Sequence, residues 1–579
     1  MVMRKNPVVL VALACALAAC SEPPPAAAAA AGTADEAAGP ADVAAGADPS
    51  GDADPSGDAA ADTALPDTEA AAPGCAHDGS VPVAYTDFAT GKLRHETAGG
   101  FAMDLVDGTT FEFGEAWTGC DVYAFVPDTI VTSELAPASV WTKDVLALLQ
   151  ASPKNVHWFF VSRQANASAA KTATEAMEER LLVALNSLPE SDAVHWLPRL
   201  HVAKKPANAQ GNWVGSVLAG HGKLGFGIDR DQKIRGFGML ADVTRQDAAL
   251  QKAGKWPWQA NLAYAAHEPV AWNAEHSRNL KLAATKPATV ALYKGEVLEE
   301  FAETDVDLPG APTMATFDTL QIEVEMRCPN ADQPEPGNCG AWDYLAHLSV
   351  VPPGAKPLEM ARFITTYHRE AHWLVDATPM LVLLQAGGKH RFRWEFAPPW
   401  NKQPTSTYLR LHLSNQGKGS RPKSATFLWT GAAWNSNFDS THANHSVPIA
   451  ATTKKTHLWV LVTGHGADKA TGCAEFCNHQ HQFAVNGQPH LLQFPMAGTQ
   501  AQCMPNMAKG MTPNQGGTWW FGRGGWCPGM QVEPWVVDVS AQVGPGTTAL
   551  LGYTGLFKGK APLDGEGNIH LTSYLVQYE

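Results

Sequence analysis

The residues most suited to chemistry lie in the short stretch GCAEFC at 472–477. It holds two cysteines four positions apart, with the carboxyl group of Glu475 between them. In an exported chain such cysteines rarely stay reduced, so we expect Cys473 and Cys477 to form a disulfide across a very short loop. Chain-entropy arithmetic assigns so short a loop only roughly 2 kcal/mol of stability. Its more useful effect is geometric, because it presents Glu475 on a rigid bend.

Two further acids stand in comparable surroundings. Asp343 follows the segment that contains Cys328 and Cys339, and Glu395 ends the apolar stretch RFRWE. Hydrolysis of an amide by water needs a positioned nucleophile and a proton for the departing nitrogen, and carboxyl groups with separated pKa values can divide this work. Acids are mostly exposed in folded proteins, however, so each could equally be a surface, turn or edge-strand charge. The residue types alone leave both interpretations open.

The N-terminal residues indicate export. Arg4 and Lys5 precede an apolar run at 8–19 that is too short to span a bilayer, which is typical of a secretory signal. The run ends in Leu-Ala-Ala-Cys, which resembles the bacterial lipoprotein signal; residues 1–19 would then be removed and Cys20 lipidated. A plain signal peptide cut nearby is the alternative. We expect a protein of the cell envelope, anchored by lipid to the outer membrane, or else an extracellular one.

Residues 20–74 are expected to form a disordered tether. They are rich in Ala, Pro, Gly and Asp and hold no aromatic residue, so they cannot bury enough apolar surface to offset the entropy of ordering. Acidic side chains of the tether account for most of the formal net charge of -15. No basic cluster elsewhere indicates a nucleic-acid partner.

Residues 75–285 are predicted to form an α/β accessory domain. Strand-like runs alternate with helical periodicity: strands at 122–126, 156–162, 195–202, 224–228 and 234–240, and helices at 140–149 and 168–188. This order predicts a buried mixed sheet and resembles a thioredoxin-like domain.

The accessory domain lacks the pattern of a redox thioredoxin. Such a protein carries its attacking thiol directly after a tryptophan and a second thiol three residues on. Here Thr118 follows Trp117, and Tyr123 stands three positions after Cys120. We therefore expect a structural or docking module without disulfide exchange activity. Export is compatible with a disulfide between Cys75 and Cys120, although spacing alone does not determine pairing.

From residue 289 onward, short alternating runs are separated by Pro, Gly and Asn. Those that fit strands lie at 320–326, 344–351, 407–412, 457–463 and 533–539. Many short strands with turn signals predict antiparallel sandwiches or jelly rolls.

Five motifs in this half resemble the bacterial peptide-N-glycosidase F family, in the same order along the chain. They are CPN…CGAWD at 328–343, RFIT at 362–365, RWE at 393–395, GCAEFC at 472–477 and GRGGWCPGM at 522–530. The resemblance covers about half of the chain. It implies a mainly β fold of two adjacent eight-stranded antiparallel jelly rolls, which we place at 290–436 and 447–579. It also implies three local disulfides: Cys328 with Cys339, Cys473 with Cys477, and Cys503 with Cys527.

The resemblance implies hydrolysis of the amide that joins an N-linked glycan to asparagine, on glycoproteins or glycopeptides, with no cofactor or metal. Asp343 matches the family's principal catalytic acid, and Glu475 matches the glutamate that acts with it through an ordered water. Glu395 completes the catalytic set and would contact the substrate.

Four further residues are expected near the substrate. Arg523 matches an arginine that would orient a glycan hydroxyl or one of the acids. Trp342 and Trp526 offer aromatic faces to sugars, although sandwich cores also use tryptophan. His465, in the turn TGHG, either points into the groove or is an ordinary turn residue.

One departure from the family lies beside the principal acid. Where the family commonly has arginine, this chain has Tyr344. Loss of that cation should raise the pKa of Asp343 or alter its hydrogen bonding.

Two other functions remain open. The jelly-roll pair resembles the fold of copper- and ascorbate-dependent monooxygenases, and His479 and His481 would share one face of a strand. A third copper ligand, such as His490, cannot be placed from the sequence. The remaining alternative is a lipoprotein that binds glycans without turnover.

Overall fold

The computed structural model describes residues 74–128, 140–142, 145–220, 225–238, 262–466, 474–499 and 502–579. Cys75–Glu579 form one compact unit. The expected signal, tether and lipidated Cys20 lie outside the described residues and stay predictions. In the part of the chain that is described, no helix combines the length and the apolar character needed to cross a membrane.

The accessory domain is built on a five-stranded sheet of order β5-β4-β3-β6-β7. Strands β3 (Val122–Pro127), β4 (Val156–Val161) and β5 (Leu200–Val202) are parallel, whereas β6 (Phe226–Ile228) and β7 (Ile234–Gly236) run antiparallel. A separate two-stranded sheet pairs β1 (Ala102–Asp104) with β2 (Thr110–Glu112), ahead of the short helix α2 (Phe113–Ala116).

Helices cover both faces of the sheet because the side chains of β3 alternate. Val122 and Ala124 face a core that includes side chains of α3 (Val145–Ala151), α4 (Ala167–Asn186) and α8 (His267–Ala284). Tyr123 and Phe125 face a second core that includes α6 (Trp213–Gly220). The expected mixed α/β sheet is therefore present. The thioredoxin-like assignment stays a prediction.

Two sequence expectations for this domain have clear outcomes. The strand predicted at 195–202 is wrong in its first half, because residues up to Trp196 end helix α5 (Glu190–Trp196) and only Leu200–Val202 form a strand. Acidic side chains in the first turn of α5 favour the helix, and Pro198 delays the strand. A disulfide joins Cys75 to Cys120, with 5.4 Å between their Cα atoms, so the thiol of Cys120 is not free.

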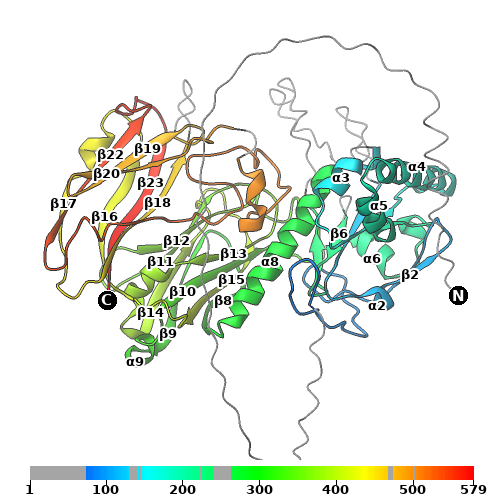
Figure 1. Ribbon diagram of the computed structural model, residues 1–579, viewed down its shortest axis with the longest axis horizontal. Coiled ribbons are helices and arrows are strands. Elements are labelled where there is room, and N and C mark those ends of the chain that lie inside the picture. Colours follow the sequence, from blue (N-terminus) through cyan, green and yellow to red (C-terminus); the bar gives the residue numbers. More distant parts are fainter. Residues whose placement is uncertain are drawn as a thin grey trace, which may run out of the picture. The chain divides into compact units, whose positions relative to one another are not determined.

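The rest of the chain forms two antiparallel sandwiches, each of two four-stranded sheets (Figure 1). The sheets of the first have the orders β13-β10-β15-β8 and β12-β11-β14-β9. Its strands are β8 (Ala288–Leu298), β9 (Phe301–Gly310), β10 (Thr319–Arg327), β11 (Leu345–Val350), β12 (Leu358–Ile364), β13 (Ala371–Asp376), β14 (Gly387–Glu395) and β15 (Thr405–Ser414). The short helix α9 (Ala311–Met314) follows β9.

The second sandwich has sheets of order β16-β23-β18-β21 and β17-β22-β19-β20. Its strands are β16 (Pro422–Ala433), β17 (His445–Pro448), β18 (Lys455–His465), β19 (His479–Val485), β20 (Gln488–Gln493), β21 (Trp535–Asp538), β22 (Thr548–Phe557) and β23 (Asn568–Tyr578). The predicted mainly β fold of two eight-stranded jelly rolls is thereby confirmed.

The expected boundary between the sandwiches is wrong. We placed it at 436–447, but β16 already pairs with β23 of the second sandwich, so that unit begins at Pro422. The polar residues around Ser436 are a turn between β16 and β17, which contains the short helix η7 (Phe438–Thr441). A turn signal inside a sandwich has the same composition as a linker between sandwiches, so composition alone does not separate them.

The two sandwiches share a core. Trp459, Leu461 and Tyr574 of the second pack in the same apolar cluster as Phe363 of the first. The segment after GWC extends the sheet of the first sandwich, because the N–H of Val532 donates to the carbonyl of Arg362 at the edge strand β12. This contact brings the motif at 522–530 to the start of β11, where Asp343 lies.

Candidate active site

Arg523 brings two of the predicted catalytic acids together. Its guanidinium is fully buried, with Nη2 3.5 Å from Oδ2 of Asp343 and Nε 3.6 Å from Oε1 of Glu475. Asp343 lies in the first sandwich, whereas Glu475 and Arg523 lie in the second. The site is therefore built only when the two sandwiches pack against each other.

The guanidinium of Arg523 is held in place by backbone and ring contacts. Nη1 donates to the carbonyls of Thr518 and Phe521 at 2.6 and 2.7 Å, and Nη2 donates to Oγ1 of Thr518 at 2.9 Å. The rings of Phe476 and Trp526 each lie 5.1 Å from its central carbon, a distance suited to cation–π attraction. Because Nη1 and Nη2 are anchored, Arg523 presents a fixed positive charge to both acids.

Asp343 is held directly before β11. Oγ1 of Thr365 donates to the carbonyl of Trp342 at 2.6 Å and accepts from the N–H of Tyr344 at 2.8 Å, which fixes the backbone on both sides of the aspartate. The carboxyl group of Asp343 also hydrogen-bonds the hydroxyl of Tyr367. Thr365 ends the RFIT motif, so that motif serves to position the acid.

Glu475 lies on a tight bend after β18. Its N–H donates to the carbonyl of Gly466 at 3.1 Å, and the N–H of Gly466 donates back to Oε2 of Glu475 at 3.3 Å. The N–H of Gly524 donates to the carbonyl of Glu475 at 2.7 Å. Gly466 contacts the backbone and the carboxyl group of Glu475, and Gly524 contacts its backbone, so these two neighbouring segments orient the residue.

Glycine is required where the chain crosses this bend. A Cβ at Gly524 would lie 2.0 Å from Nε2 of His479 and 2.7 Å from the carbonyl oxygen of Ala474. A Cβ at Gly464 would lie 1.9 Å from the same oxygen. The glycines of GRGG and TGHG therefore allow the backbone to pass close to the residue before Glu475.

The surroundings raise the pKa values of both acids. Burial raises the pKa of Glu475 to about 7, the negative charge of Asp343 adds to the rise, and the positive charge of Arg523 opposes it. Burial also raises the pKa of Asp343, against the lowering effects of Arg523 and of the hydrogen bond from Tyr367. A carboxyl group with a pKa of about 7, as in Glu475, can exchange a proton close to neutral pH, the property that general acid–base catalysis needs.

Tyr344 does not leave the principal acid without a cation. Its hydroxyl accepts from Nδ2 of Asn401 at 2.7 Å, while Arg523 supplies the positive charge beside Asp343. The pKa of Asp343 is raised, as expected, but burial is the largest cause.

The structure does not bring Glu395 to Arg523. The residue ends β14, where its carboxylate pairs with Arg393 at 3.0 Å and is 48% exposed. In the sheet it stands opposite His347, four residues beyond Asp343, which corresponds to up to roughly 13 Å along a strand. The ion pair of its carboxylate is the one with Arg393, so its placement in the catalytic set stays a prediction. Contact with a distant part of a substrate stays a prediction.

The predicted sugar-binding residues differ in exposure. Trp342, next to Asp343, is 52% exposed and can offer a face to a ligand. Trp526 is only 6% exposed, and its Nε1 donates to the carbonyl of Gly464 at 2.7 Å. Its ring stacks with that of His465, 4.7 Å between centroids. Trp526 thus has little surface for a sugar; its evident contacts are with Arg523 and His465.

His465 is the half-buried last residue of β18, paired with Asn568 of β23, so the turn expected at TGHG is wrong. Its pKa lies well below the usual value, chiefly because of burial. It is therefore neutral at physiological pH, and its ring also packs edge-on against His570 at 5.2 Å. Substrate contact by His465 stays a prediction.

The histidines of the copper alternative form a buried hydrogen-bond chain. Nδ1 of His479 lies 2.6 Å from Nε2 of His481, whose Nδ1 lies 2.7 Å from the hydroxyl of Tyr553. His490 instead pairs with Oε1 of Gln542 at 2.9 Å. Among the described residues, the groups compact enough to hold a metal ion do not include His479 or His481. These contacts disfavour the copper alternative.

Disulfides brace the two sides of the site. Cys328 is bonded to Cys339, and Cys503 to Cys527, as the resemblance implied. Cys477 is disulfide-bonded, while Cys473 lies outside the described residues.

Two residues of the site were missed in the sequence. Tyr367 reaches Asp343, and Thr518 holds Arg523. Tyr367 stands two positions after RFIT, and Thr518 lies five positions before Arg523. Proximity to a motif was the only available signal, because a lone tyrosine or threonine has no spacing that marks its role.

Comparisons with known proteins found a matching family model and a similar curated protein. Residues 433–576 match the family described as peptide-N-glycosidase F, C terminal. The curated protein peptide-N(4)-(N-acetyl-beta-D-glucosaminyl)asparagine amidase F of Elizabethkingia miricola is 24% identical over 259 residues, which cover 42% of this chain and 69% of that protein.

Solved structures of similar proteins were also found. One is PNGase F, a glycosylasparaginase from Flavobacterium meningosepticum, with 19% identity, coverage of 50% of this chain and 96% of that chain, and a TM-score of 0.39. Another is PNGF-II, with 12% identity, coverage of 52% and 67%, and a TM-score of 0.37.

Proposed function

We propose, on the premise that the C-terminal half of this chain is peptide-N-glycosidase F-like, that the protein hydrolyses the amide between an N-linked glycan and asparagine. The products would be a glycosylamine and a peptide in which asparagine has become aspartate. The observation that carries the proposal is the buried Arg523 between Asp343 and Glu475. This group stands at the positions that match the family motifs.

The geometry supports a division of labour between the two acids. Glu475, with a pKa of about 7, is partly protonated at neutral pH and can donate a proton to the departing nitrogen. Asp343 receives hydrogen bonds from Tyr367 and Arg523, which favour its ionised form, so it can accept a proton from the attacking water. The water oxygen bonds to the amide carbon, the carbon–nitrogen bond breaks, and the proton of Glu475 leaves with the glycosylamine.

Arg523 has an electrostatic task in this scheme. Negative charge develops on the amide oxygen as water attacks, and a fixed, buried cation nearby stabilises such charge without reorganisation. It also keeps one of the two acids ionised while the other holds a proton.

The test uses the full-length protein and an N-glycosylated glycopeptide in water enriched in heavy oxygen. We expect loss of the entire glycan and the appearance of one heavy oxygen atom in the aspartate formed. Asp343→Asn should fail under the same conditions. Cleavage that leaves a sugar on asparagine would contradict the proposal, because it would show attack on a glycosidic bond.

Glycan binding without release would instead support the binding-protein alternative. The same glycopeptide, immobilised, distinguishes this outcome: retention of the protein with no product by mass spectrometry would replace the enzyme by a lectin-like lipoprotein.

We also propose that the protein is anchored to the cell envelope through lipidated Cys20, so that its substrates are extracellular glycoproteins. The lipoprotein-like ending Leu-Ala-Ala-Cys supports this. Mass spectrometry of the mature N-terminus tests it; an unmodified N-terminus after residue 20 would contradict lipidation.

A further inference from the structure

The segment from Thr366 to Glu370, between β12 and β13, connects the active site with the accessory domain. At its start, the hydroxyl of Tyr367 hydrogen-bonds Asp343. Two and three residues later, Arg369 and Glu370 form buried ion pairs with residues of the accessory domain. We call this segment the catalytic loop.

Arg369 anchors the catalytic loop to helix α8. Its Nη1 lies 3.0 Å from Oε1 of Glu268, and its Nη2 lies 3.3 Å from Oε2, so the pair is bidentate. Nη2 also donates to the carbonyl of Gly236 at the end of β7. Glu268 is almost completely buried. Bidentate pairs of this kind have fixed geometry, and removing one partner of a buried pair strongly destabilises the protein.

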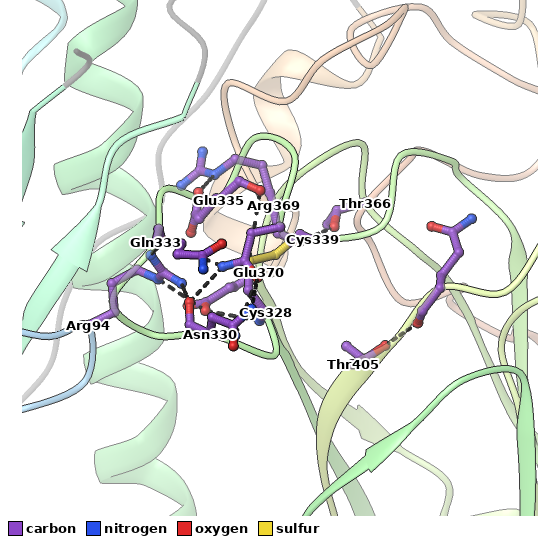
Figure 2. The surroundings of a disulfide bond; sticks show 12 residues. Arg94, Cys328, Asn330, Gln333, Glu335, Cys339, Thr366, Arg369, Glu370 and Thr405 are labelled. Carbon is purple, nitrogen blue, oxygen red and sulfur yellow. Dashed lines mark hydrogen bonds and ion pairs between the residues drawn. A yellow bond between two sulfur atoms is a disulfide. The ribbon is translucent and has the colours of Figure 1, made fainter. Parts of the chain in front are cut away.

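Glu370 makes a second anchor (Figure 2). Its Oε1 accepts from Nε of Arg94 at 3.1 Å. Its Oε2 lies 2.6 Å from Nε2 of His95. Arg94 also donates to the carbonyl of Asn330, inside the loop closed by the disulfide between Cys328 and Cys339. The accessory domain therefore forms hydrogen bonds and ion pairs with both the catalytic loop and the disulfide loop that precedes Asp343.

A parallel route leads to Arg523. Asn514, which is fully buried, donates through Nδ2 to the carbonyl of Tyr264 at 2.9 Å and to Oε1 of Glu268 at 3.1 Å. The next residue, Gln515, accepts from the N–H of Tyr367 at 3.0 Å. Thr518, four residues after Asn514, holds the guanidinium of Arg523.

The segments that hold Tyr367 and Arg523, the two partners of Asp343, thus both contact the buried carboxylate of Glu268. The backbone between them also needs external support, because His368 has a φ of +58°, a conformation that residues other than glycine rarely adopt. Such conformations persist when the surroundings hold them. The anchors at Arg369 and Glu370 follow His368 directly.

We propose that Glu268 of the accessory domain is a positioning residue for the active site, holding Tyr367 through Arg369 and Arg523 through Asn514. The accessory domain is then a structural part of the catalytic unit and not a separate docking module. The kinetic arm of the test below rests on the proposed function; the exchange arm does not.

The test compares two substitutions on helix α8. Glu268→Gln keeps the shape of the side chain, and Arg369 retains its ion pair with Glu335. Glu275→Gln is the matched control. Glu275 also links helix α8 to the first sandwich, because its Oε1 lies 3.0 Å from Nδ1 of His372. His372, however, lies on β13 and not on the catalytic loop.

The first readout is hydrogen–deuterium exchange, which needs no activity. We expect Glu268→Gln to speed exchange in 365–370 and 514–518, where the amides of Tyr367, His368 and Gly516 are hydrogen-bonded. Glu275→Gln should leave both segments unchanged. Unchanged exchange in the Glu268→Gln protein, or equal acceleration in the two variants, would overturn the proposal.

The second readout is a double-mutant cycle on glycan release. Glu268→Gln should lower kcat by on the order of tenfold with little change in KM, and should move the acid limb of the pH profile upward, because Asp343 loses a stabilised hydrogen bond from Tyr367. Tyr367→Phe should move it likewise, and combining the two should add little. Additive losses would show that Glu268 does not act through Tyr367. Absence of glycan release by the unsubstituted protein would contradict the proposed function, and exchange alone would then decide this inference.

Discussion

Glu475 differs from an ordinary surface glutamate because burial and the charge of Asp343 raise its pKa to about 7. The positive charge of Arg523 limits this rise. Removing the carboxyl group of Glu475 should therefore slow the chemical step more than it weakens substrate binding. Removing the exposed carboxyl group of Glu395 should mainly weaken substrate binding.

Glu475→Gln should lower kcat by about 10²- to 10⁴-fold, the usual contribution of a general acid or base. Its amide keeps the shape of the side chain but cannot exchange a proton. Initial rates on a glycopeptide measure this, with Glu395→Gln as the comparison. Because Glu395 is exposed and its carboxylate pairs with Arg393, its substitution should raise KM at nearly unchanged kcat. Equal losses of kcat in the two variants would contradict this assignment of roles.

The same pKa predicts a pH-dependent stability difference. Since the pKa rises from 4.5 to about 7 on folding, the folded state holds the proton more tightly, and stability is lost as pH rises through this window. At about 1.4 kcal/mol for each pKa unit, Glu475→Gln should be more stable than wild type by on the order of 3 kcal/mol at pH 8.5. At pH 5 the difference should fall below about 1 kcal/mol. Urea unfolding at both pH values tests the sign; a variant that is less stable at pH 8.5 would refute the raised pKa.

At the scale of elements, the bend after β18 depends on the close passage of three chain segments. Gly464, Ala474 and Gly524 meet around Nε2 of His479, which belongs to the buried chain of His481 and Tyr553. His479, considered above as a copper ligand with His481, thus packs against the bend that carries Glu475.

Gly524→Ala should displace this bend. The added methyl group would clash with His479 and with the backbone of Ala474, and overpacking of this kind costs about 1–3 kcal/mol. Thermal unfolding should show the loss, and kcat should fall because the N–H of Gly524 holds Glu475. Gly220→Ala is the control, since a Cβ there meets nothing within 4 Å. Wild-type stability and kcat in Gly524→Ala would show that the bend can accommodate a methyl group at position 524, against the contacts seen in the structure.

At the scale of the whole molecule, the site depends on the junction of the two sandwiches. Arg362 of β12 donates to Oγ1 of Thr463 at 2.9 Å and to the carbonyl of His570 at 2.7 Å in the second sandwich. It also forms a bidentate pair with Glu359. One side chain therefore links the sheet that carries Asp343 to the strand that leads to Glu475.

Arg362→Ala should lower the free energy of unfolding by about 3–5 kcal/mol, because it leaves Glu359, whose side chain is only 10% exposed, without its main cation. Chemical denaturation measures this. Arg391→Ala is the matched control: that arginine pairs with Asp305 on the exposed face of the same sheet and should contribute at most about 1 kcal/mol. Similar losses in the two variants would mean that the junction is not held by Arg362.

Much of the local structure could be predicted from the sequence. Period-two alternation marks strands such as β10, where Leu320, Ile322 and Val324 face the core. The motif positions identified Asp343, Glu475 and Arg523 as members of one site. The expectations that failed were those in which a local signal has two meanings, as for the helix α5 and for the turn taken as a boundary at 436–447.

The sequence by itself indicated several of the strands and helices, because those preferences are set by neighbouring residues, and its motifs singled out Asp343, Glu475 and Arg523. Only the tertiary structure decided that Arg523 stands between acids of different sandwiches, and that Glu268 pairs with Arg369 on the loop of Tyr367. These contacts join residues far apart in the chain. They exist only after whole sheets pack, so no pattern of neighbouring residues encodes them.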